Sequence, residues 1–271
     1  MKMESESSSD IVDAAERLAF QQRLDAFVAS RDAGYTLTLD ALRAGISLRA
    51  VVDTATDVAR FADEAIDIVK EEYRPSLDCK EGCSYCCCKP GVLVSVPEFV
   101  RILDHVRSAF SADDISALTQ RARAYAAQLQ GRNFNEFIDD SIPCPFLDKG
   151  RCSVYAIRPL VCRGYNSTSV DACRDAHTNG DHLVPIFSVI KDVTDGATIG
   201  TSQCLQRAGV NDALLDLGTA VGIALQSGNE FIADVLTGGR ALAKAQDSTW
   251  VPELWSRVKE LARQVGTPMN C

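Results

Sequence analysis

The sequence predicts a mostly α-helical protein in which helical arms surround an irregular, cysteine-rich, metal-binding core. Apolar residues recur at helical spacing on both sides of the cysteines. The cysteines are bunched, and the downstream ones lie in a stretch that proline and glycine repeatedly interrupt. Such an irregular stretch can be ordered if a bound metal substitutes for a local hydrophobic core.

Four segments follow from these patterns. Residues 1–9 are acidic and serine-rich, which predicts a disordered tail. Residues 10–75 are expected to form an N-terminal helical arm, residues 76–182 a cysteine-rich domain, and residues 183–271 a C-terminal helical pack.

The N-terminal arm is expected to contain one helix from Asp10 to near Gly34 and one or two more over residues 39–73. Gly45 marks an interruption and Pro75 a stop, because proline removes a backbone donor and breaks a helix.

The C-terminal pack is expected to contain three helices, over residues 211–226, 229–245 and 251–265. Residues 184–193 are apolar, and their pattern leaves helix and strand both open.

Two further helices are expected inside the cysteine-rich domain, from Pro97 to about Phe110 and from Ser111 to residue 130. Two antiparallel helices with a short connection return the chain to its starting end. We therefore expect this hairpin to bring Cys144 back beside Cys83, so that the two groups of cysteines meet.

The first group of cysteines follows the spacing C-x3-C-x2-C-C-C over residues 79–88. Disulfide frameworks spread their cysteines to join distant segments, whereas thiolates that bind one ion or cluster must converge on it. Adjacent cysteines seldom bond to each other, so the run indicates metal ligation. The alternative is a run of small buried apolar side chains, since free cysteine packs in that way.

The second group begins at Cys144 and includes the phrases CPFL, CSVY and RP-x-x-CR, with Cys173 about ten residues later. Together with the first run, these residues resemble the YkgJ-like, or CxxCxxCC, family of zinc- or iron-chelating domains. The resemblance covers roughly residues 75–175, and Cys88 is extra to the family pattern. It implies that the metal ligands are Cys79, Cys83, Cys86, Cys87, Cys144, Cys152, Cys162 and Cys173.

The identity of the metal and the number of sites stay open in the sequence. Eight thiolates suffice for one four-thiolate site with four to spare or for two sites, and four sulfur ligands suit Zn²⁺ or an iron–sulfur cluster. A zinc ribbon usually has two C-x2-C knuckles, and here there is one, between Cys83 and Cys86. A short cysteine run with a remote fourth ligand favours an iron–sulfur cluster.

Other candidates lie beside the cysteines. Arg158 and Arg163 are able to bind a substrate carboxylate or phosphate, to offset thiolate charge, or to bond loop carbonyls structurally. Tyr155 and Tyr165 are candidates for hydrogen bonds to sulfur or for packing. Glu98 either orients a metal ligand through a hydrogen bond without binding the metal itself, or serves as the acidic residue that a helix N-terminus favours.

The remaining candidates are weaker. His105 lies in an expected helix, which places it away from the metal, whereas His177 and His182 follow Cys173 closely enough to be considered as ligands. Cys204 and Cys271 match no family position and are expected to be a buried small side chain and a terminal thiol.

Composition limits the classes of partner. The net charge is −9, and residues 76–180 contain as many acidic as basic residues, so the basic stripe that nucleic acid requires is missing. The sequence shows neither a membrane-spanning apolar run nor a secretion signal, and its many cysteines suit a reducing, cytoplasmic compartment. The helical arms are candidates for binding a protein partner, and neither nucleic acid nor a membrane is expected.

Three functions fit these observations. The first is a metal-binding protein that holds an iron–sulfur cluster or zinc. The second comes from the resemblance, because the family includes flagellin lysine N-methylases, and would be an iron–sulfur-dependent methylase that uses S-adenosylmethionine. The third is a redox or metal sensor that works through reversible thiol oxidation.

Overall fold

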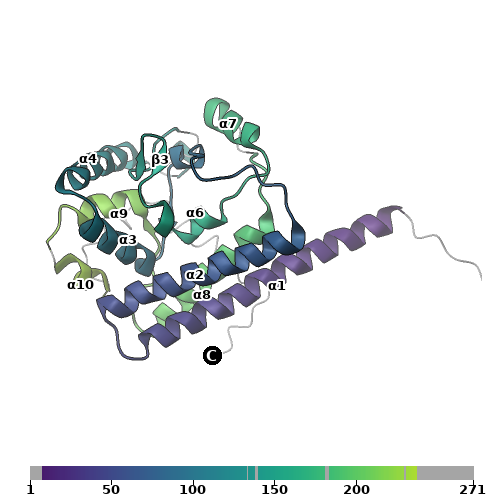
Figure 1. The fold of residues 1–271 in the computed structure, drawn as a ribbon, viewed down its shortest axis with the longest axis horizontal. Helices are drawn as coiled ribbons and strands as arrows, with labels where there is room; N and C mark the ends of the chain where they lie inside the picture. The colour runs from purple at the N-terminus through teal and green to yellow at the C-terminus, as the bar shows by residue number, and fades with distance from the viewer. Residues whose placement is uncertain (1–7, 133, 138–139, 181–182, 229, 237–271) are drawn as a thin grey trace, which may run out of the picture.

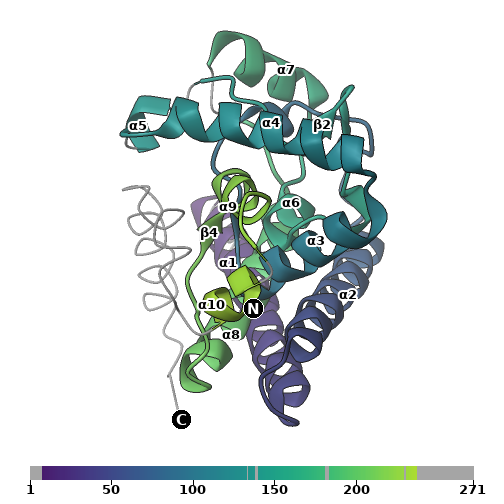
Figure 2. The same ribbon diagram turned by 90° about the vertical axis from the view of Figure 1, so that its left-hand side faces the viewer.

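Two long helices and a shorter one form the base of the molecule. The computed structural model describes residues 8–236 except 133, 138–139, 181–182 and 229. Helices α1 (Ser8–Leu42), α2 (Leu48–Tyr73) and α8 (Ser188–Arg207) lie side by side in Figures 1 and 2.

Helices α1 and α8 pack backbone against backbone. A Cβ atom added to Gly200 would lie 1.9 Å from the carbonyl oxygen of Arg31, and one added to Gly196 would lie 2.3 Å from that of Phe27. On the other helix, a Cβ on Gly34 would lie 2.4 Å from the carbonyl oxygen of Ala197. Only glycine permits this approach.

The expected end of the first helix near Gly34 is wrong, because α1 continues to Leu42. Gly34 gives room to α8 instead of ending the helix. The expected interruption at Gly45 is confirmed: Gly45 has a φ of 105°, and α2 starts after Ser47, whose side chain accepts a hydrogen bond from the backbone N–H of Ala50.

Above the base lie α3 (Val96–Ala109) and α4 (Ala112–Leu129), which confirm the two helices expected from Pro97 onward. Strand β1 (Leu93–Val94) pairs with β4 (Leu215–Asp216) in antiparallel fashion, Leu93 opposite Asp216. The short pairing joins the segment before α3 to the segment after α8.

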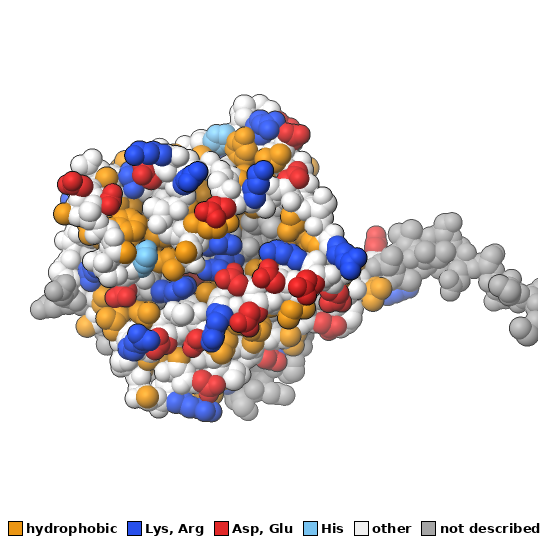
Figure 3. Space-filling view, in the orientation of Figure 1, with side chains coloured by type: hydrophobic (Ala, Val, Ile, Leu, Met, Phe, Trp, Pro, Cys, Tyr) orange, Lys and Arg blue, Asp and Glu red, His pale blue; other side chains and the backbone are white. Residues whose placement is uncertain are grey.

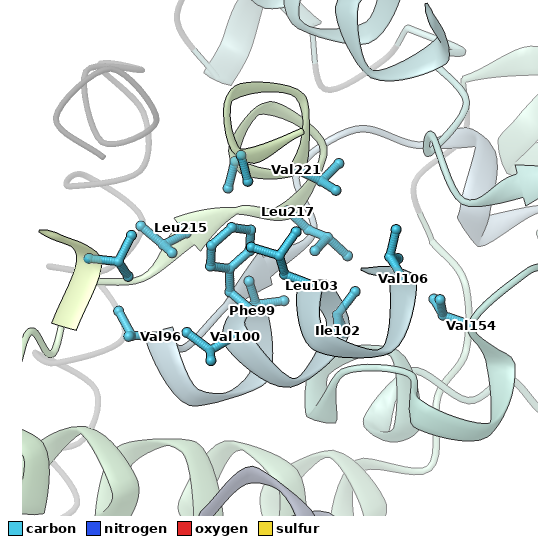
Figure 4. Close-up of a cluster of buried hydrophobic side chains, with 14 of the residues drawn as sticks. Val96, Phe99, Val100, Ile102, Leu103, Val106, Val154, Leu215, Leu217 and Val221 are labelled. Atoms are coloured by element: carbon cyan, nitrogen blue, oxygen red, sulfur yellow. The ribbon is translucent and has the colours of Figure 1, made fainter. Parts of the chain in front are cut away.

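The main hydrophobic core lies between α3, α4 and α9 (Leu217–Ala224). Phe99 and Leu103 of α3 face Leu217 and Val221 of α9 (Figure 4). Burial of such side chains contributes roughly 1.5–3 kcal/mol each, so this core anchors the elements that carry the cysteines.

The other elements of the cysteine-rich domain are short. They are η1 (Cys86–Cys88), α5 (Phe134–Phe137), β2 (Leu147–Asp148), β3 (Arg151–Cys152), η2 (Tyr155–Ile157), α6 (Leu160–Gly164) and α7 (Val170–Asn179). Strands β2 and β3 form a hairpin that pairs Leu147 with Cys152. The expected fold class is therefore confirmed: helices surround an irregular segment that is rich in cysteines.

The C-terminal pack differs from expectation. The ambiguous residues 184–193 lead into α8, and the helix expected over 211–226 is instead β4 followed by α9, because residues 215–216 pair with β1. Helix α10 (Glu230–Leu236) occupies the start of the expected 229–245 helix, and residues 251–265 lie outside the described part of the chain. No helix among the described residues is long and apolar enough to cross a membrane.

A buried polar pair ties α4 to the start of α9. The Tyr125 hydroxyl donates to the Asp216 carboxylate at 2.8 Å and accepts from the backbone N–H of Gly91 at 3.1 Å. Asp216 also caps α9 by accepting from the backbone N–H of Thr219 at 2.9 Å. Complete burial raises the pKa of Asp216 above its ordinary value, although these hydrogen bonds act in the opposite direction.

We expect Asp216→Ala to lower the free energy of unfolding by about 2–4 kcal/mol, because it removes a helix cap and leaves the Tyr125 hydroxyl without its acceptor. Asp216→Asn keeps an acceptor oxygen and should cost less. Urea denaturation of both variants and the parent measures the difference.

The raised pKa gives the Asp216 variants a pH signature. The folded parent binds its proton more tightly than the unfolded chain, so this residue's contribution to stability is lost as pH rises from about 4 through the folded-state pKa. The Asp216→Asn variant does not titrate, so its free energy of unfolding should rise relative to that of the parent over the same pH range. A stability difference that stays constant with pH would contradict the assignment.

Candidate metal centre

The two cysteine segments meet at the end of the molecule where α7 and the β2–β3 hairpin lie (Figures 1 and 2). The backbone N–H of Cys144 donates to the carbonyl oxygen of Cys87 at 2.8 Å. The chain therefore returns after the α3–α4 hairpin as the sequence predicts, with Cys87 as the partner of Cys144 in place of the expected Cys83.

The run of three cysteines forms one 3₁₀ turn, η1. Backbone bonds from Cys87 to Ser84 and from Cys88 to Tyr85 wind it tightly. A 3₁₀ helix has three residues per turn, so successive side chains point about 120° apart. The three side chains therefore leave the turn in different directions, although the Cys86 and Cys87 thiols still share a hydrogen bond.

A small hollow at the surface gathers four of the thiols. Its lining consists of Asp78, Cys79, Cys83, Cys86, Tyr165, Ser167, Val170 and Cys173. Burial raises the pKa of the Cys79 thiol, and the nearby Cys83 and Cys173 thiols raise it further. We call Cys79, Cys83, Cys86 and Cys173 the outer set.

Backbone contacts hold the two sides of this hollow together. The N–H groups of Asp78 and Cys79 donate to the Ser167 carbonyl oxygen at 2.9 and 3.2 Å. The Asp78 carboxylate accepts from the N–H of Val170 at 3.0 Å, at the first residue of α7. These bonds fix the start of α7, and with it Cys173, against Cys79.

The other four thiols lie deeper, beside the main core. Cys144 and Cys152 pack against the cluster that includes Phe146 and Val154. Burial raises the pKa of Cys144 to about 12, and the thiols of Cys87 and Cys152 also raise it.

Cys162 of α6 completes this deeper group. Burial raises its pKa well above the ordinary thiol value, and the neighbouring thiols of Cys144, Cys87 and Cys152 add to the effect. We call Cys87, Cys144, Cys152 and Cys162 the inner set.

Cys86 and Cys87 link the two sets. The Cys86 thiol donates a hydrogen bond to the Cys87 sulfur, which lowers the pKa of Cys87 to about 7 and raises that of Cys86. The grouping differs from the order of the sequence, because Cys173 joins the first segment and Cys87 joins the second.

The donor chemistry of both sets suits a soft metal, because each offers four thiols and thiolates select zinc, copper(I) and iron–sulfur clusters. No three cysteine, histidine or acidic side chains among the described residues already converge closely enough to hold an ion. Binding would therefore require the thiols to move inward and to lose their protons.

The pattern of these cysteines has a known counterpart. Residues 78–181 match the CxxCxxCC family model, whose description is a putative zinc- or iron-chelating domain. This segment is a CxxCxxCC domain. No curated protein and no solved structure matches the chain.

Glu98 connects the CxxCxxCC domain's α6 to α3. One oxygen of its carboxylate accepts from the N–H and the hydroxyl of Ser95, at 2.9 and 2.7 Å. The other accepts from the N–H of Leu160 at 2.7 Å, two residues before Cys162. Both roles considered from the sequence are present, since Glu98 caps α3 and positions the helix that carries an inner-set cysteine.

Arg163 bonds loop carbonyls, as one of the sequence interpretations has it. It donates to the carbonyl oxygens of Arg158 and Ala156, at 2.9 and 3.1 Å, and pairs with Asp63 of α2. Acidic side chains gather along α2 in Figure 3, and Asp63 is the one that joins this helix to the CxxCxxCC domain.

Arg158 and both tyrosines stay close to the cysteines. The Arg158 guanidinium stacks on the Tyr155 ring, 4.3 Å from its centroid, and its charge partly offsets the rise that burial causes in the pKa of Cys79 and of Cys152. It therefore offsets thiolate charge in both sets. Tyr165 lines the outer hollow, and its carbonyl oxygen lies 3.9 Å from the Cys79 sulfur.

The histidines differ in their distance from the cysteines. His105 stacks on Phe110, away from the cysteines. His177 lies one helical turn after Cys173 on α7, and its ring packs 5.8 Å from that of Tyr85. Its Nδ1 atom is buried and has no hydrogen-bond partner in the part of the chain that the structure describes. His182 lies outside the described residues.

The cysteines that do not match the family also separate from the rest. Cys204 is buried in α8, as the sequence predicts. Cys88 is partly buried on the third side of η1, and Cys271 lies outside the described residues.

Asp78 is the residue that sequence reasoning missed. Its carboxylate joins the first cysteine segment to α7 across 92 positions. Its place directly before Cys79 is the only local signal, and nothing in the sequence identifies its distant partner.

Proposed function

We propose that this protein binds metal through the eight cysteines of its CxxCxxCC domain, with an iron–sulfur cluster as the favoured form and zinc as the alternative. The observation that carries the proposal is the meeting of two distant cysteine segments at one end of the fold. There the backbone N–H of Cys144 donates a hydrogen bond to the carbonyl oxygen of Cys87. Thiols brought together from both segments are the ligands that soft metals and clusters require.

The arrangement of the outer set supports the cluster. Cys79, Cys83 and Cys86 come from one short run, and Cys173 approaches from a remote helix. A short run with a remote fourth cysteine is a common way to ligate an iron–sulfur cluster. The cluster would supply electron transfer or structural support, and the chain's part is to position the thiols and to offset their charge through Arg158.

The methylase alternative is less well supported. Chemistry on S-adenosylmethionine at a three-cysteine cluster needs one iron with an open position. Here a fourth thiol, Cys173, lines the same hollow as the three clustered cysteines. A filled fourth position favours a metal that is structural, electron-carrying or stored.

The proposal predicts that the full chain, purified without oxygen, contains iron and sulfide and shows the broad visible absorption of sulfur-to-iron charge transfer. Metal analysis and an absorption spectrum of the same sample measure this. Cys204→Ser is the matched control, because Cys204 is a buried cysteine outside both sets and should not alter the metal content.

The outcomes separate the alternatives. Stoichiometric zinc in a colourless protein would replace the cluster with zinc and keep the metal-binding function. A chain that contains neither metal, and that takes up neither on reconstitution, would overturn the proposal.

A further inference from the structure

We propose that the CxxCxxCC domain contains two adjoining metal sites, an inner one formed by Cys87, Cys144, Cys152 and Cys162 and an outer one formed by Cys79, Cys83, Cys86 and Cys173. The inference rests on the proposed metal-binding function and goes beyond it. Each site would take a soft metal, as a zinc ion or an iron–sulfur cluster, and the outer metal would exchange first.

The number of thiols is greater than one ion can bind. A zinc ion takes four thiolates at about 2.3 Å from its centre, and the two sets together offer eight. Cys86 and Cys87 are neighbours in η1 and their thiols share a hydrogen bond, so the two sites would adjoin at this pair.

The outer grouping follows from the hollow. Of the eight family cysteines, those that line it are Cys79, Cys83, Cys86 and Cys173. The bonds from Asp78 and Cys79 to the Ser167 carbonyl oxygen keep its two walls together.

The inner grouping follows from contacts beneath η1. Cys144 bonds to the Cys87 backbone, and its own carbonyl oxygen accepts from the N–H of Leu147, which pairs with Cys152 across the hairpin. Glu98 holds the start of α6 and so positions Cys162. The thiols of this set also act on one another electrostatically, because each one raises the pKa of another member or has its pKa raised by one. Such mutual effects indicate that the thiols lie close together.

The two sites differ in their access to solvent. Cys79 and Cys86 of the outer set are exposed, whereas every member of the inner set is partly buried. Cys144 and Cys152 also pack against the main core. A chelator should therefore reach the outer metal without disturbing the fold, and the inner metal only after local opening.

The test uses the full chain, stripped and reloaded with zinc alone under reducing conditions. We expect about two zinc ions per chain, each in a four-thiolate site. The Cys79→Ser/Cys173→Ser variant should retain the inner ion and lose the outer one, because a hydroxyl is a poor substitute for a thiolate. A chelator should remove zinc from the parent in a fast and a slow phase, and from this variant in the slow phase alone.

Two controls accompany the test. Cys88→Ser changes the third cysteine of the same turn and should retain both ions. Cys144→Ser/Cys162→Ser should lose the inner ion, and circular dichroism shows whether the rest of its helices persist.

Other results would overturn the inference. A parent that binds one zinc ion, or an outer-set variant that loses all its zinc, would show that the eight cysteines act as one site. A parent that binds no zinc and no iron would instead overturn the proposed function itself, so the two failures are distinguishable.

Discussion

Removal of the metal should expose residues 140–175 to protease before it exposes α1, α2 or α8. Within this stretch the described elements are two-residue strands, one 3₁₀ turn and the first part of α7, together with the five-residue α6. Its buried apolar side chains, Ile142, Phe146, Val154 and Leu160, belong to three different clusters and form no core of their own. A structural metal contributes on the order of 10 kcal/mol of apparent binding energy that becomes folding energy. Loss of that energy should unfold the stretch locally.

Limited proteolysis of the loaded and the chelated chain, with the cleavage sites identified by mass spectrometry, measures this effect. Added zinc should restore protection. Helix α1 serves as the internal control, because it packs on α8 backbone against backbone, whereas α2 and α8 also pack against Leu160 of the cysteine-bearing α6. Identical cleavage patterns and melting curves with and without metal would mean that the metal is not part of the fold.

Gly200→Ala should destabilise the protein by roughly 3 kcal/mol, through overpacking at the α1–α8 contact. The new methyl group would lie 1.9 Å from the Arg31 carbonyl oxygen, and backbone cannot rotate out of the way as a side chain can. Helix propensity alone predicts the opposite sign, since alanine is favoured over glycine by about 1 kcal/mol in a helix.

Urea denaturation decides between the two signs for Gly200→Ala. Gly228→Ala is the matched control, because no atom of the described residues lies within 4 Å of the position of its Cβ. Gly196→Ala should resemble Gly200→Ala, and the double variant should prevent α1 from docking on α8. A Gly200→Ala protein as stable as its parent would show that the two helices can separate at little cost.

Local signals explain which elements the sequence predicts well. Ser111 accepts from the N–H of Asp114 and begins α4 where the capping pattern places it, and Ser95 with Glu98 does the same for α3. Helix α8 carries weaker signals, because Gly196 and Gly200 lower its intrinsic propensity. Its helical form depends on α1, which lies far away in the sequence.

The candidate metal centre is likewise predicted only in part from the sequence. The meeting of the two cysteine segments follows from the α3–α4 hairpin, and the eight candidate ligands follow from the resemblance to the CxxCxxCC family. The placement of Cys173 in the outer set and of Cys87 in the inner set does not, because it depends on the hydrogen bond from Val170 to Asp78 and on the backbone contact between Cys144 and Cys87. The sequence suggests that cysteines of one segment bind together, whereas the fold forms each set from cysteines of both segments.

The contact between α1 and α8 also bears on how the chain folds as it leaves the ribosome. Synthesis proceeds from the N-terminus, so α1 and α2 emerge first, but their partner α8 ends only at Arg207. Strand β1 likewise cannot pair until β4 has been synthesised, and α4 cannot pack against α9 until α9 has emerged. The CxxCxxCC domain is complete at residue 181, before any of these partners has emerged. Its cysteines can therefore meet a metal while the face of α1 that Gly196 and Gly200 of α8 later cover is still exposed, and closure of the core comes last.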